Sequence, residues 1–506
     1  MPDKYDVLIV GAGVAGSSLA HALATAPRPS SSPSLRIAVL ERSLDEPDRI
    51  VGELMQPGGV IALKKLGLES VLENIDAAKV KGYCVCDAGK IVEIPYPGGH
   101  EGRSFHHGRL IMNLRAAVRR APGVDLIEGT VTDLIEENSR VTGVRAILKG
   151  AEEKRPFYAS LVVVADGCYS NFRSSVSAIK PTTKSHFVGA ILEDAVLPIP
   201  NHGTVALIKG SGPVLLYQIS EHDTRILIDV KQPIPADLKA HILANIAPLL
   251  PASVQLPVKI ALEKDRLRRM PNSYLPSAPQ GRASSKPGVV LIGDSWNMRH
   301  PLTGGGMTVA LSDIVLLRSH LASVPDLSDW RAVSRVLNQW CRDRKPLAST
   351  VNILSVALYD LFGADAPELE VLRTGCFKYF ERGGECVNGP VSILSALAPS
   401  PALLTYHFFS VAFYSIWVMF THPRPIPGPP HAEPRYAAAR VDEYPFLLIR
   451  SVRVFYTACI VFGPLLWMEM FAHSGPGRGA LLGAGVVLAV AVGGAVYSDS
   501  YATLLR

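Results

Sequence analysis

From residue 1 to about residue 400, the chain alternates short apolar runs with segments whose apolar residues recur at helical spacing, the pattern of an α/β fold. Helical patterns follow the first and the last of the four runs that are predicted to be strands. These strands are Tyr5–Val10, Arg36–Leu40, Leu161–Val164 and Val289–Ile292. Between the last two, residues 181–280 alternate apolar and polar positions, which predicts a β-rich insertion.

Three long apolar stretches follow, Leu403–Phe420, Phe455–Phe471 and Ala480–Tyr497, each near the ~20 residues of a bilayer-crossing helix. The first contains His407 and the second Glu469, which weakens both as membrane spans. Five arginines lie between them, at positions 424, 435, 440, 450 and 453. Loops rich in Lys and Arg stay in the cytoplasm, so the segment that carries these arginines is expected on the same side of the membrane as the main part of the chain. The first stretch is therefore expected to lie on or within one leaflet, and the last two to form a hairpin with both ends in the cytoplasm. A helix of a soluble core is the alternative for the first stretch.

Composition narrows the class of protein. Of the 506 residues, 48% are hydrophobic and 19% are charged, and the net charge is +6. This much apolar surface excludes a disordered or fibrous protein, and thinly spread positive charge argues against a nucleic-acid partner. Seven cysteines at irregular spacing exclude a complete disulfide framework and favour a reducing compartment.

The histidines and cysteines predict no metal site. Cys84 and Cys86 are too close in sequence for a usual zinc pair and are expected on one face of a strand. His106 and His107 are adjacent, and on a strand they would point to opposite faces, which argues against joint ligation of a metal. Packing in a loop or beside the cofactor is expected instead.

A glycine-rich turn follows the first predicted strand. Gly11 permits the tight turn, Gly13 lets the backbone approach a pyrophosphate, and Gly16 lets the next helix pack closely on the strand. The pyrophosphate would lie at the helix N-terminus, where free N–H groups and the helix dipole favour anions. The second strand ends at Glu41, where an acidic residue hydrogen-bonds the adenosine ribose. This predicts a Rossmann-type site, and its N-terminal position favours resident FAD over diffusing NAD(P).

A second glycine-rich segment follows the strand at residues 289–292. Asp294 is placed to accept hydrogen bonds from the ribityl hydroxyls of a flavin. The turn from Pro301 to Gly306, with Gly305 within it, offers backbone without side chains for a flavin ring to lie against. A helix is predicted to start near Met307, with its N–H groups directed at the pyrimidine edge of the flavin.

Four longer segments, residues 41–59, 102–115, 297–307 and 383–390, carry a more specific signal than the glycine spacing. Through them the sequence resembles the squalene monooxygenase (squalene epoxidase) family of FAD-dependent monooxygenases, from about residue 5 to residue 470. The resemblance implies a hydrogen-bonded pair of Tyr83 and Gln56 near the flavin, and Tyr217 in the substrate region. It also implies FAD contacts at Val14, Ala15, Glu41, Arg42, Arg49, Leu54, Arg115, Val131, Asp294 and Met307.

These patterns together predict an FAD-binding domain in two parts, residues 1–180 and 281–345, with a β-rich substrate domain at residues 181–280 between them. Residues 346–400 are expected to be helices that line the substrate entrance, and residues 401–506 to be membrane-associated helices. Val351–Phe362 and Cys376–Phe380 are expected to line the mouth of the pocket together with the first apolar stretch.

The resemblance implies epoxidation of squalene to (S)-2,3-epoxysqualene with O₂ through an FAD C4a-hydroperoxide, in sterol biosynthesis. Electrons would come from NADPH through a separate NADPH-cytochrome reductase, and the sequence has no second glycine fingerprint of its own for NADPH. The implied location is the endoplasmic reticulum membrane, with the catalytic domain facing the cytoplasm, and lipid droplets as a second location. The alternatives are a flavin-dependent reductase of geranylgeranyl-type chains and a non-catalytic membrane flavoprotein.

Overall fold

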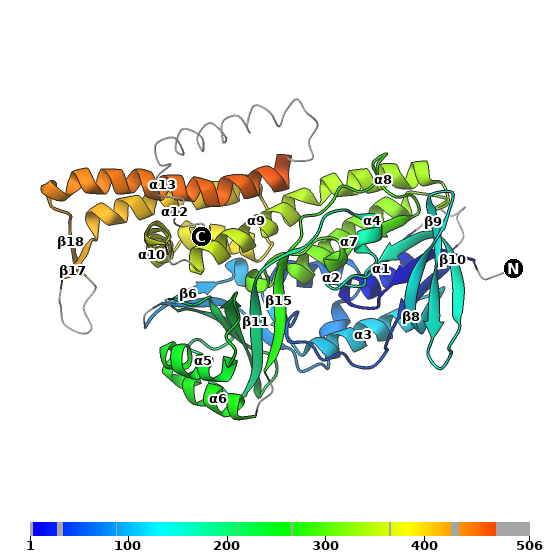
Figure 1. Cartoon of the computed structure of the whole chain (residues 1–506), viewed down its shortest axis with the longest axis horizontal. Coiled ribbons are helices and arrows are strands. Elements are labelled where there is room, and N and C mark those ends of the chain that lie inside the picture. The colour runs from blue at the N-terminus through cyan, green and yellow to red at the C-terminus, as the bar shows by residue number, and fades with distance from the viewer. Residues whose placement is uncertain are drawn as a thin grey trace.

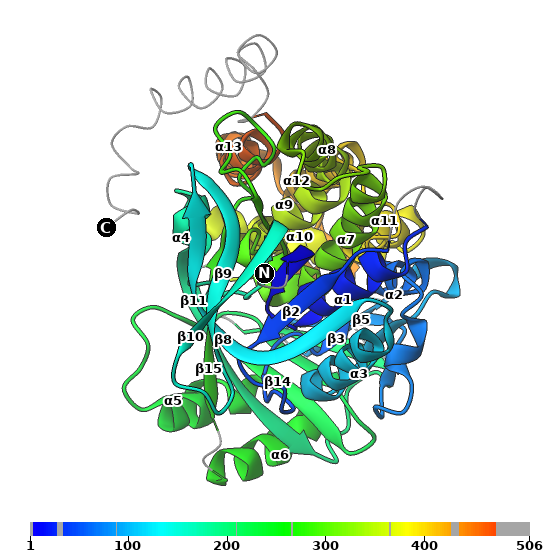
Figure 2. The ribbon, with the colours of Figure 1, turned by 90° about the vertical axis from the view of Figure 1, so that its right-hand side faces the viewer.

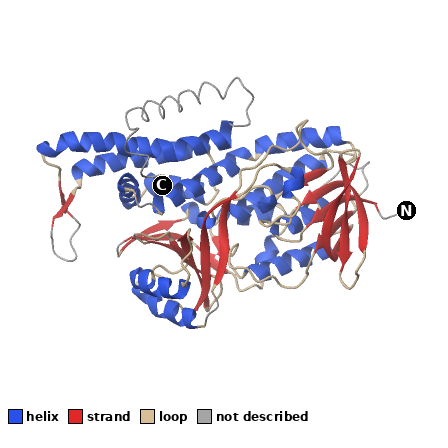
Figure 3. Ribbon diagram, in the orientation of Figure 1, coloured by secondary structure: helices blue, strands red, loops and turns tan. Residues whose placement is uncertain are grey.

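The structure, a computed structural model, describes residues 4–27, 34–87, 89–208, 210–264, 267–363, 366–426 and 435–471. The third apolar stretch, Ala480–Tyr497, lies outside these residues. The described chain folds around two large sheets with helices packed against them, and a layer of long helices lies along one side (Figures 1 and 3).

The first sheet has six strands and contains all four predicted strands. In it β1 runs parallel to β2 and β10, β2 pairs parallel with β8, and β10 pairs parallel with β16. β9 pairs antiparallel with both β8 and β10. The strands are β1 (Lys4–Val10), β2 (Ile37–Glu41), β8 (Val124–Glu137), β9 (Arg140–Leu148), β10 (Lys154–Val164) and β16 (Val289–Leu291). β1 and β2 are buried along most of their length, since parallel strands are covered on both faces.

Helices α1 (Val14–Ala24), α3 (His107–Arg120) and α7 (Gly306–Ala322) pack together beside this sheet, as Figure 2 shows for α1, α3 and α7. The helices predicted after the first and last strands are confirmed as α1 and α7. Neither of the adjacent histidines lies on a strand, since His106 caps α3 and α3 begins at His107. The buried residues of α3 recur at helical spacing, as Leu110, Ile111 and Leu114 do, and this pattern decides the local structure.

The second sheet has seven strands in the order β15-β11-β14-β13-β12-β5-β6. Five come from the predicted β-rich region: β11 (Thr182–Glu193), β12 (His202–Leu207), β13 (Val214–Gln218), β14 (Asp223–Lys231) and β15 (Arg268–Tyr274). The other two strands, β5 (Gly82–Asp87) and β6 (Lys90–Pro95), come from much earlier in the chain. They belong to this sheet because β5 pairs parallel with β12 and β6 pairs with β5. Cys84 and Cys86 share one face of β5, as predicted. That face packs in one core with α5 (Leu238–Asn245) and α6 (Ala252–Glu263).

A third, small sheet consists of β3 (Leu54–Met55), β7 (Gly102–Ser104) and β4 (Ala78–Val80). Short helices α2 (Pro57–Lys65) and α4 (Arg173–Val176) lie between the larger elements. The helical layer consists of α8 (Trp330–Asp343), α9 (Lys345–Phe362), α10 (Pro367–Glu381), α11 (Glu385–Leu394), α12 (Pro401–Thr421) and α13 (Tyr444–Leu466). The α13 helix continues into a π-helical turn at Trp467–Phe471.

Two helical segments of the described chain are long and apolar enough to cross a membrane, Pro401–Thr421 and Val441–Met470. They pack against each other and extend past the body, with the short β17–β18 hairpin (Arg424–Ile426 and Arg435–Ala437) at their far end (Figure 1). The predicted hairpin of the second and third stretches cannot be compared, since its second half lies outside the described residues. Large apolar side chains are exposed on both helices: Tyr406, Phe413, Trp417, Phe446, Leu448, Ile449 and Val452.

Glu469, the charged residue within the second apolar stretch, is bound to the body of the protein formed by the two large sheets and their helices. Its Oε1 accepts hydrogen bonds from the Tyr274 hydroxyl at 2.8 Å and from Asn352 Nδ2 at 3.0 Å. Its side chain is buried. The C-terminal end of this helical segment therefore docks onto the body through a polar contact, which explains why an apolar stretch carries a carboxylate.

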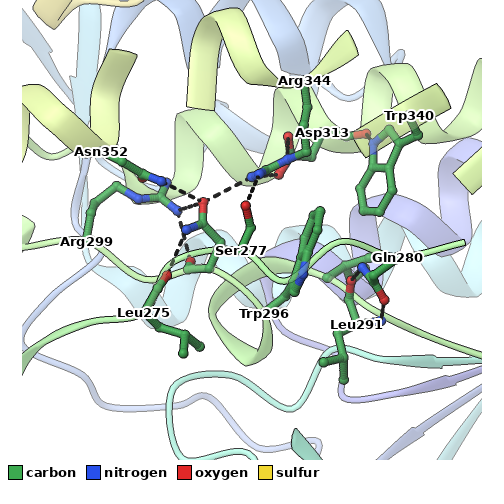
Figure 4. Close-up of polar contacts among 12 residues, drawn as sticks. Leu275, Ser277, Gln280, Leu291, Trp296, Arg299, Asp313, Trp340, Arg344 and Asn352 are labelled. Carbon is green, nitrogen blue, oxygen red and sulfur yellow. Dashed lines mark hydrogen bonds and ion pairs between the residues drawn. The ribbon is translucent and has the colours of Figure 1, made fainter. Parts of the chain in front are cut away.

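The contact continues from Asn352 into a buried network around the side chain of Asn297. Figure 4 shows Arg299, Arg344, Asp313 and Asn352, which belong to this network. Asn297 Oδ1 accepts hydrogen bonds from Arg299 at 2.8 Å and from Arg344 at 3.0 Å. Arg344 also makes two 2.8 Å bonds to the Asp313 carboxylate and lies over the ring of Trp296. The network thereby joins the loop after β16 to α7 and α9, the helix that carries Asn352.

We predict that Glu469→Ala lowers the thermal stability of the detergent-solubilised protein by several degrees. The substitution leaves buried donors of Tyr274 and Asn352 unpaired, which costs about 2 to 4 kcal/mol. Glu469→Gln keeps an acceptor oxygen and has a smaller effect. The matched control is Glu263→Ala, an exposed side chain at the end of α6, which leaves the midpoint of thermal unfolding unchanged. A Glu469→Ala midpoint equal to that of the control contradicts the docking role.

Candidate functional site

A cavity of about 610 Å³ lies between the two sheets. Its walls come from the carboxyl ends of β1, β2, β10 and β16, the N-terminus of α1, and the inner face of the seven-stranded sheet. Fifteen of the predicted site residues line it: Gly11, Gly13, Val14, Ala15, Glu41, Arg42, Arg49, Leu54, Tyr83, Arg115, Val131, Tyr217, Asp294, Gly306 and Met307. Gly16, Gln56 and Gly305 lie behind the wall, where they shape or support it.

The first glycine turn is closely packed on one side and open on the other. Gly11 has φ +103°, and a Cβ there would lie 2.6 Å from the carbonyl oxygen of Ala165. A Cβ at Gly16 would lie 1.9 Å from the carbonyl oxygen of Gly11. At Gly13 a Cβ would meet no atom within 4 Å, because this residue faces the cavity at the start of α1. The backbone is therefore accessible to a ligand at Gly13.

Glu41 is held against this turn at the end of β2. Its Oε2 accepts a hydrogen bond from the backbone N–H of Ala12 at 2.7 Å and lies 3.6 Å from Arg115 Nη2. Arg115 in turn donates to the carbonyl oxygens of Ala12 at 3.1 Å and Asp45 at 2.9 Å. Burial lowers the pKa of the Arg115 guanidinium, and Glu41 opposes that shift. The carboxylate is thus fixed at the mouth of the glycine turn.

The second glycine turn meets the first. A Cβ at Gly293, whose φ is +62°, would lie 2.9 Å from the Cβ of Ala15 in α1. Asp294 follows and projects its side chain into the cavity. The surrounding protein raises the pKa of this carboxyl, and the positive charges of Arg299, Arg49 and Arg173 oppose the rise.

Arg173 braces the second turn from behind, and sequence patterns did not identify it. Its guanidinium donates to the carbonyl oxygens of Ser295 at 2.8 Å and Asp294 at 3.0 Å. It also binds the carbonyl oxygen of Cys168 at 2.9 Å, in the turn after β10. Arg173 thereby ties together two loops at the cavity edge. In the sequence, Arg173 lies shortly after Asp166 and Gly167, the turn that follows the predicted strand at residues 161–164. That position is the sequence signal that could have identified it.

Tyr83 and Gln56 are in contact, as the family resemblance implied. Gln56 is fully buried at the N-terminus of α2, and its Nε2 donates to the Tyr83 hydroxyl oxygen. The same amide nitrogen donates to the carbonyl oxygen of Thr303 at 2.6 Å, and Tyr96 donates to Gln56 Oε1 at 2.7 Å. Burial raises the pKa of Tyr83 to about 12, and the hydrogen bonds with Gln56 and Tyr96 oppose the rise. Sequence analysis missed Tyr96 and Thr303.

The part of the cavity beneath the seven-stranded sheet is largely apolar. Tyr217 lies there among Leu215, Leu227, Met270 and Leu302. Burial raises the pKa of Tyr217 well above its ordinary value. A ligand in this part therefore meets apolar side chains and neutral hydroxyls.

A buried ion pair supports this wall. Arg225 Nε and Nη2 bind the two carboxylate oxygens of Glu53 at 2.7 and 2.9 Å. Glu53 lines the cavity and directly precedes Leu54. Sequence analysis gave neither residue, because the two are far apart in the chain.

The adjacent histidines serve separate contacts. His106 Nε2 lies 2.9 Å from Asp223, and His107 Nδ1 lies 2.8 Å from the carbonyl oxygen of Gly52. Burial lowers the pKa of His107 to about 4, so it is neutral at physiological pH. Within the described ranges, no group of three or more His, Cys, Asp or Glu side chains is arranged to hold a metal ion.

A second, smaller cavity of about 80 Å³ lies in the helical layer. Helices α9 to α13 all contribute to it, and nearly all of its walls are apolar. Its lining includes Leu354, Leu358, Leu361, Cys376, Phe380, Leu404 and Phe408.

The larger cavity fits a dinucleotide. The open backbone at Gly13 and the N-terminus of α1 suit a pyrophosphate, and the fixed carboxylate of Glu41 suits a ribose. Asp294 lies at the second turn, where a carboxylate accepts hydrogen bonds from hydroxyl groups. The apolar part under the seven-stranded sheet lies beyond this polar end.

Comparison with known proteins gives consistent matches. The squalene epoxidase family model matches residues 158–432. The chain is 42% identical to squalene monooxygenase of Mus musculus, over 92% of this chain and 78% of that protein. It is 43% identical to squalene epoxidase erg1 of Aspergillus fumigatus, over 92% of this chain and 94% of that protein.

Solved structures show the same fold at low identity. The flavin-dependent brominase Bmp2 is 15% identical with a TM-score of 0.65, over 81% of this chain and 99% of its own. The p-nitrophenol 4-monooxygenase PnpA of Pseudomonas putida is 16% identical with a TM-score of 0.64, over 80% and 98%. With the family model and the close relatives, these findings show that the chain belongs to the squalene epoxidase family.

Proposed function

We propose that this protein is an FAD-dependent monooxygenase that converts squalene to (S)-2,3-epoxysqualene with O₂. The observation that carries the proposal is that the larger cavity joins a polar end suited to a dinucleotide to an apolar end. Membership of the squalene epoxidase family supports the substrate. The long apolar walls suit a hydrocarbon, and they explain why the site needs no charged group to hold it.

FAD is proposed to lie across the two glycine turns. Gly11, Gly13, Val14, Ala15 and Arg115 would hold the pyrophosphate end, with Gly16 allowing α1 to pack closely. Asp294 would hold the ribityl chain, and Gly306 and Met307 the ring, with Gly305 supporting the same turn from behind the wall. The remaining proposed contacts are Glu41, Arg42, Arg49, Leu54 and Val131. The chemistry that bound FAD supplies is the reductive activation of O₂ to an electrophilic oxygen atom.

The residues of this chain bind and orient the alkene and exclude water. An alkene is a weak nucleophile, so no acid–base pair is required of the protein. Leu215, Leu227 and Leu302 would hold the chain of the substrate with Tyr217, and a dry cavity protects the activated oxygen from hydrolysis. Tyr83, held by Gln56, would present a neutral hydroxyl to the reacting end.

Squalene is proposed to reach this cavity from a membrane. Its escape into water is prohibitive, at about 0.8 kcal/mol per CH₂ group. The exposed apolar side chains of α12 and α13 would contact lipid, and the small apolar cavity beneath them would lie on the route. We place the enzyme at the endoplasmic reticulum membrane, with lipid droplets as a second location and the catalytic body in the cytoplasm. NADPH would supply electrons through a separate reductase.

The proposed reaction is tested with protein purified in detergent. With FAD, squalene, NADPH, a cytochrome reductase and air, the expected product is epoxysqualene, identified by mass spectrometry. Without O₂ no product forms. Anaerobic saturation of double bonds in a polyprenyl substrate instead identifies a reductase. Bound FAD with no reductase-dependent product identifies a non-catalytic flavoprotein.

We predict that Gly13→Val removes FAD without damaging the fold. The added Cβ meets no protein atom within 4 Å, and the side chain occupies the proposed pyrophosphate position. FAD content is expected to fall by more than about tenfold, a loss above ~1.4 kcal/mol, while the melting temperature of the apoprotein stays unchanged. Gly16→Val is the contrast, since its side chain overlaps the Gly11 carbonyl and lowers apoprotein stability. Normal FAD content in Gly13→Val contradicts the assignment.

We predict that the outer faces of α12 and α13 lie in lipid. Spin labels are attached at Trp417→Cys and Leu448→Cys in nanodiscs, where the native cysteines are buried or half-buried. Oxygen, which concentrates in lipid, should relax these labels more than a water-soluble nickel complex. The control is Leu256→Cys, an equally exposed apolar position on α6, where the nickel complex should dominate. Labels at 417 and 448 that behave like the control refute lipid contact.

A further inference from the structure

The side-chain amide of Gln56 lies where three parts of the fold meet. Gln56 directly precedes α2. Its amide nitrogen donates to the hydroxyl of Tyr83 on β5 and to the carbonyl oxygen of Thr303 in the turn before α7. Tyr96, just after β6, provides a third contact from the other side. The amide is fully buried, so all of its hydrogen-bonding capacity must be satisfied by these neighbours.

One backbone carbonyl sets the direction of every hydrogen bond in this group. The Thr303 oxygen only accepts, so the Gln56 amide must turn its nitrogen toward it, at 2.6 Å. The Gln56 oxygen then faces Tyr96, which must donate, at 2.7 Å. The second N–H of Gln56 points to the Tyr83 oxygen, which accepts. Tyr83 therefore keeps its own proton to donate, with the oxygen of the neighbouring Tyr96 and the cavity that Tyr83 lines both within its reach.

We propose that Tyr96 is a positioning residue: by donating to Gln56 it locks the amide that holds the Tyr83 hydroxyl in place at the cavity wall. The proposal rests on the proposed function, in which that cavity holds FAD and the reacting end of squalene. Tyr96 touches neither directly, since it does not line the cavity. It acts only through Gln56 and Tyr83.

The surroundings of Tyr96 suit this role. Its ring meets the ring of Tyr83 edge to face, with centroids 6.0 Å apart, so both side chains are fixed by packing as well as by hydrogen bonds. Only 4% of Tyr96 is exposed. Burial raises the pKa of Tyr96 well above its ordinary value, so it keeps the proton that it donates at any physiological pH.

The test is a double-mutant cycle of Tyr96→Phe and Tyr83→Phe in full-length protein with FAD and reductase. Tyr96→Phe should lower kcat about threefold to tenfold, the loss of one neutral hydrogen bond, with KM for squalene within about twofold of wild type. In the Tyr83→Phe background, Tyr96→Phe should have no further effect on kcat. The matched control is Tyr5→Phe, which removes another buried tyrosine hydroxyl, bonded to Asp125 at 2.9 Å outside the cavity.

A second readout does not depend on the reaction. In the apoprotein, the melting-temperature shift of the double variant should be smaller than the sum of the two single shifts, because both break one chain. Equal effects of Tyr96→Phe with and without Tyr83, in kcat or in melting temperature, overturn the proposal, as does a kcat equal to that of Tyr5→Phe. If wild type makes no epoxide, the proposed function fails while the melting cycle still tests the hydrogen-bond chain.

Discussion

The site depends on the close approach of two backbone turns that are nearly three hundred positions apart in sequence. Gly16 lies against the Gly11 carbonyl, Gly11 lies against the Ala165 carbonyl, and Gly293 lies against Ala15. No side chain fits at these contacts, so α1, β10 and the loop after β16 are held at one fixed separation. That separation gives the polar end of the cavity its shape. The charged residues around it, Glu41 and Asp294 among them, are then placed by the ends of the strands.

The second sheet closes the cavity from the opposite side, and Gln56 is where the two halves are joined by hydrogen bonds. Its amide connects α2, β5 and the turn before α7 within one buried group. The Glu53–Arg225 ion pair adds a similar link from the start of the small sheet to β14. The helical layer is tied to the same loop through Asn297, Asn352 and Glu469. Polar contacts therefore fix the elements that surround the apolar part of the cavity relative to one another.

Local sequence predicts the elements whose signal is local. Four of the six strands of the first sheet, the helices after the first and last of these four, and the glycine turns all follow from apolar runs and glycine spacing. The positions of Arg173, Tyr96 and Thr303 do not follow, because each acts on a partner brought near only by folding. The assignment of β5 to the second sheet rests likewise on a distant pairing with β12. Glu469 counts against a membrane span when the second apolar stretch is viewed alone. Its role becomes visible only in the fold, because its hydrogen-bond partners, Tyr274 and Asn352, lie elsewhere in the chain.

The central claim is that one cavity brings a flavin, molecular oxygen and a terminal alkene together. The most direct measurement uses the FAD-loaded protein with reductase, NADPH and squalene under ¹⁸O₂. The account predicts epoxysqualene that carries one labelled oxygen atom, while the same experiment in H₂¹⁸O under ordinary O₂ gives unlabelled epoxide. Product that takes its oxygen from water, or labelled gas that yields no epoxide, contradicts the account.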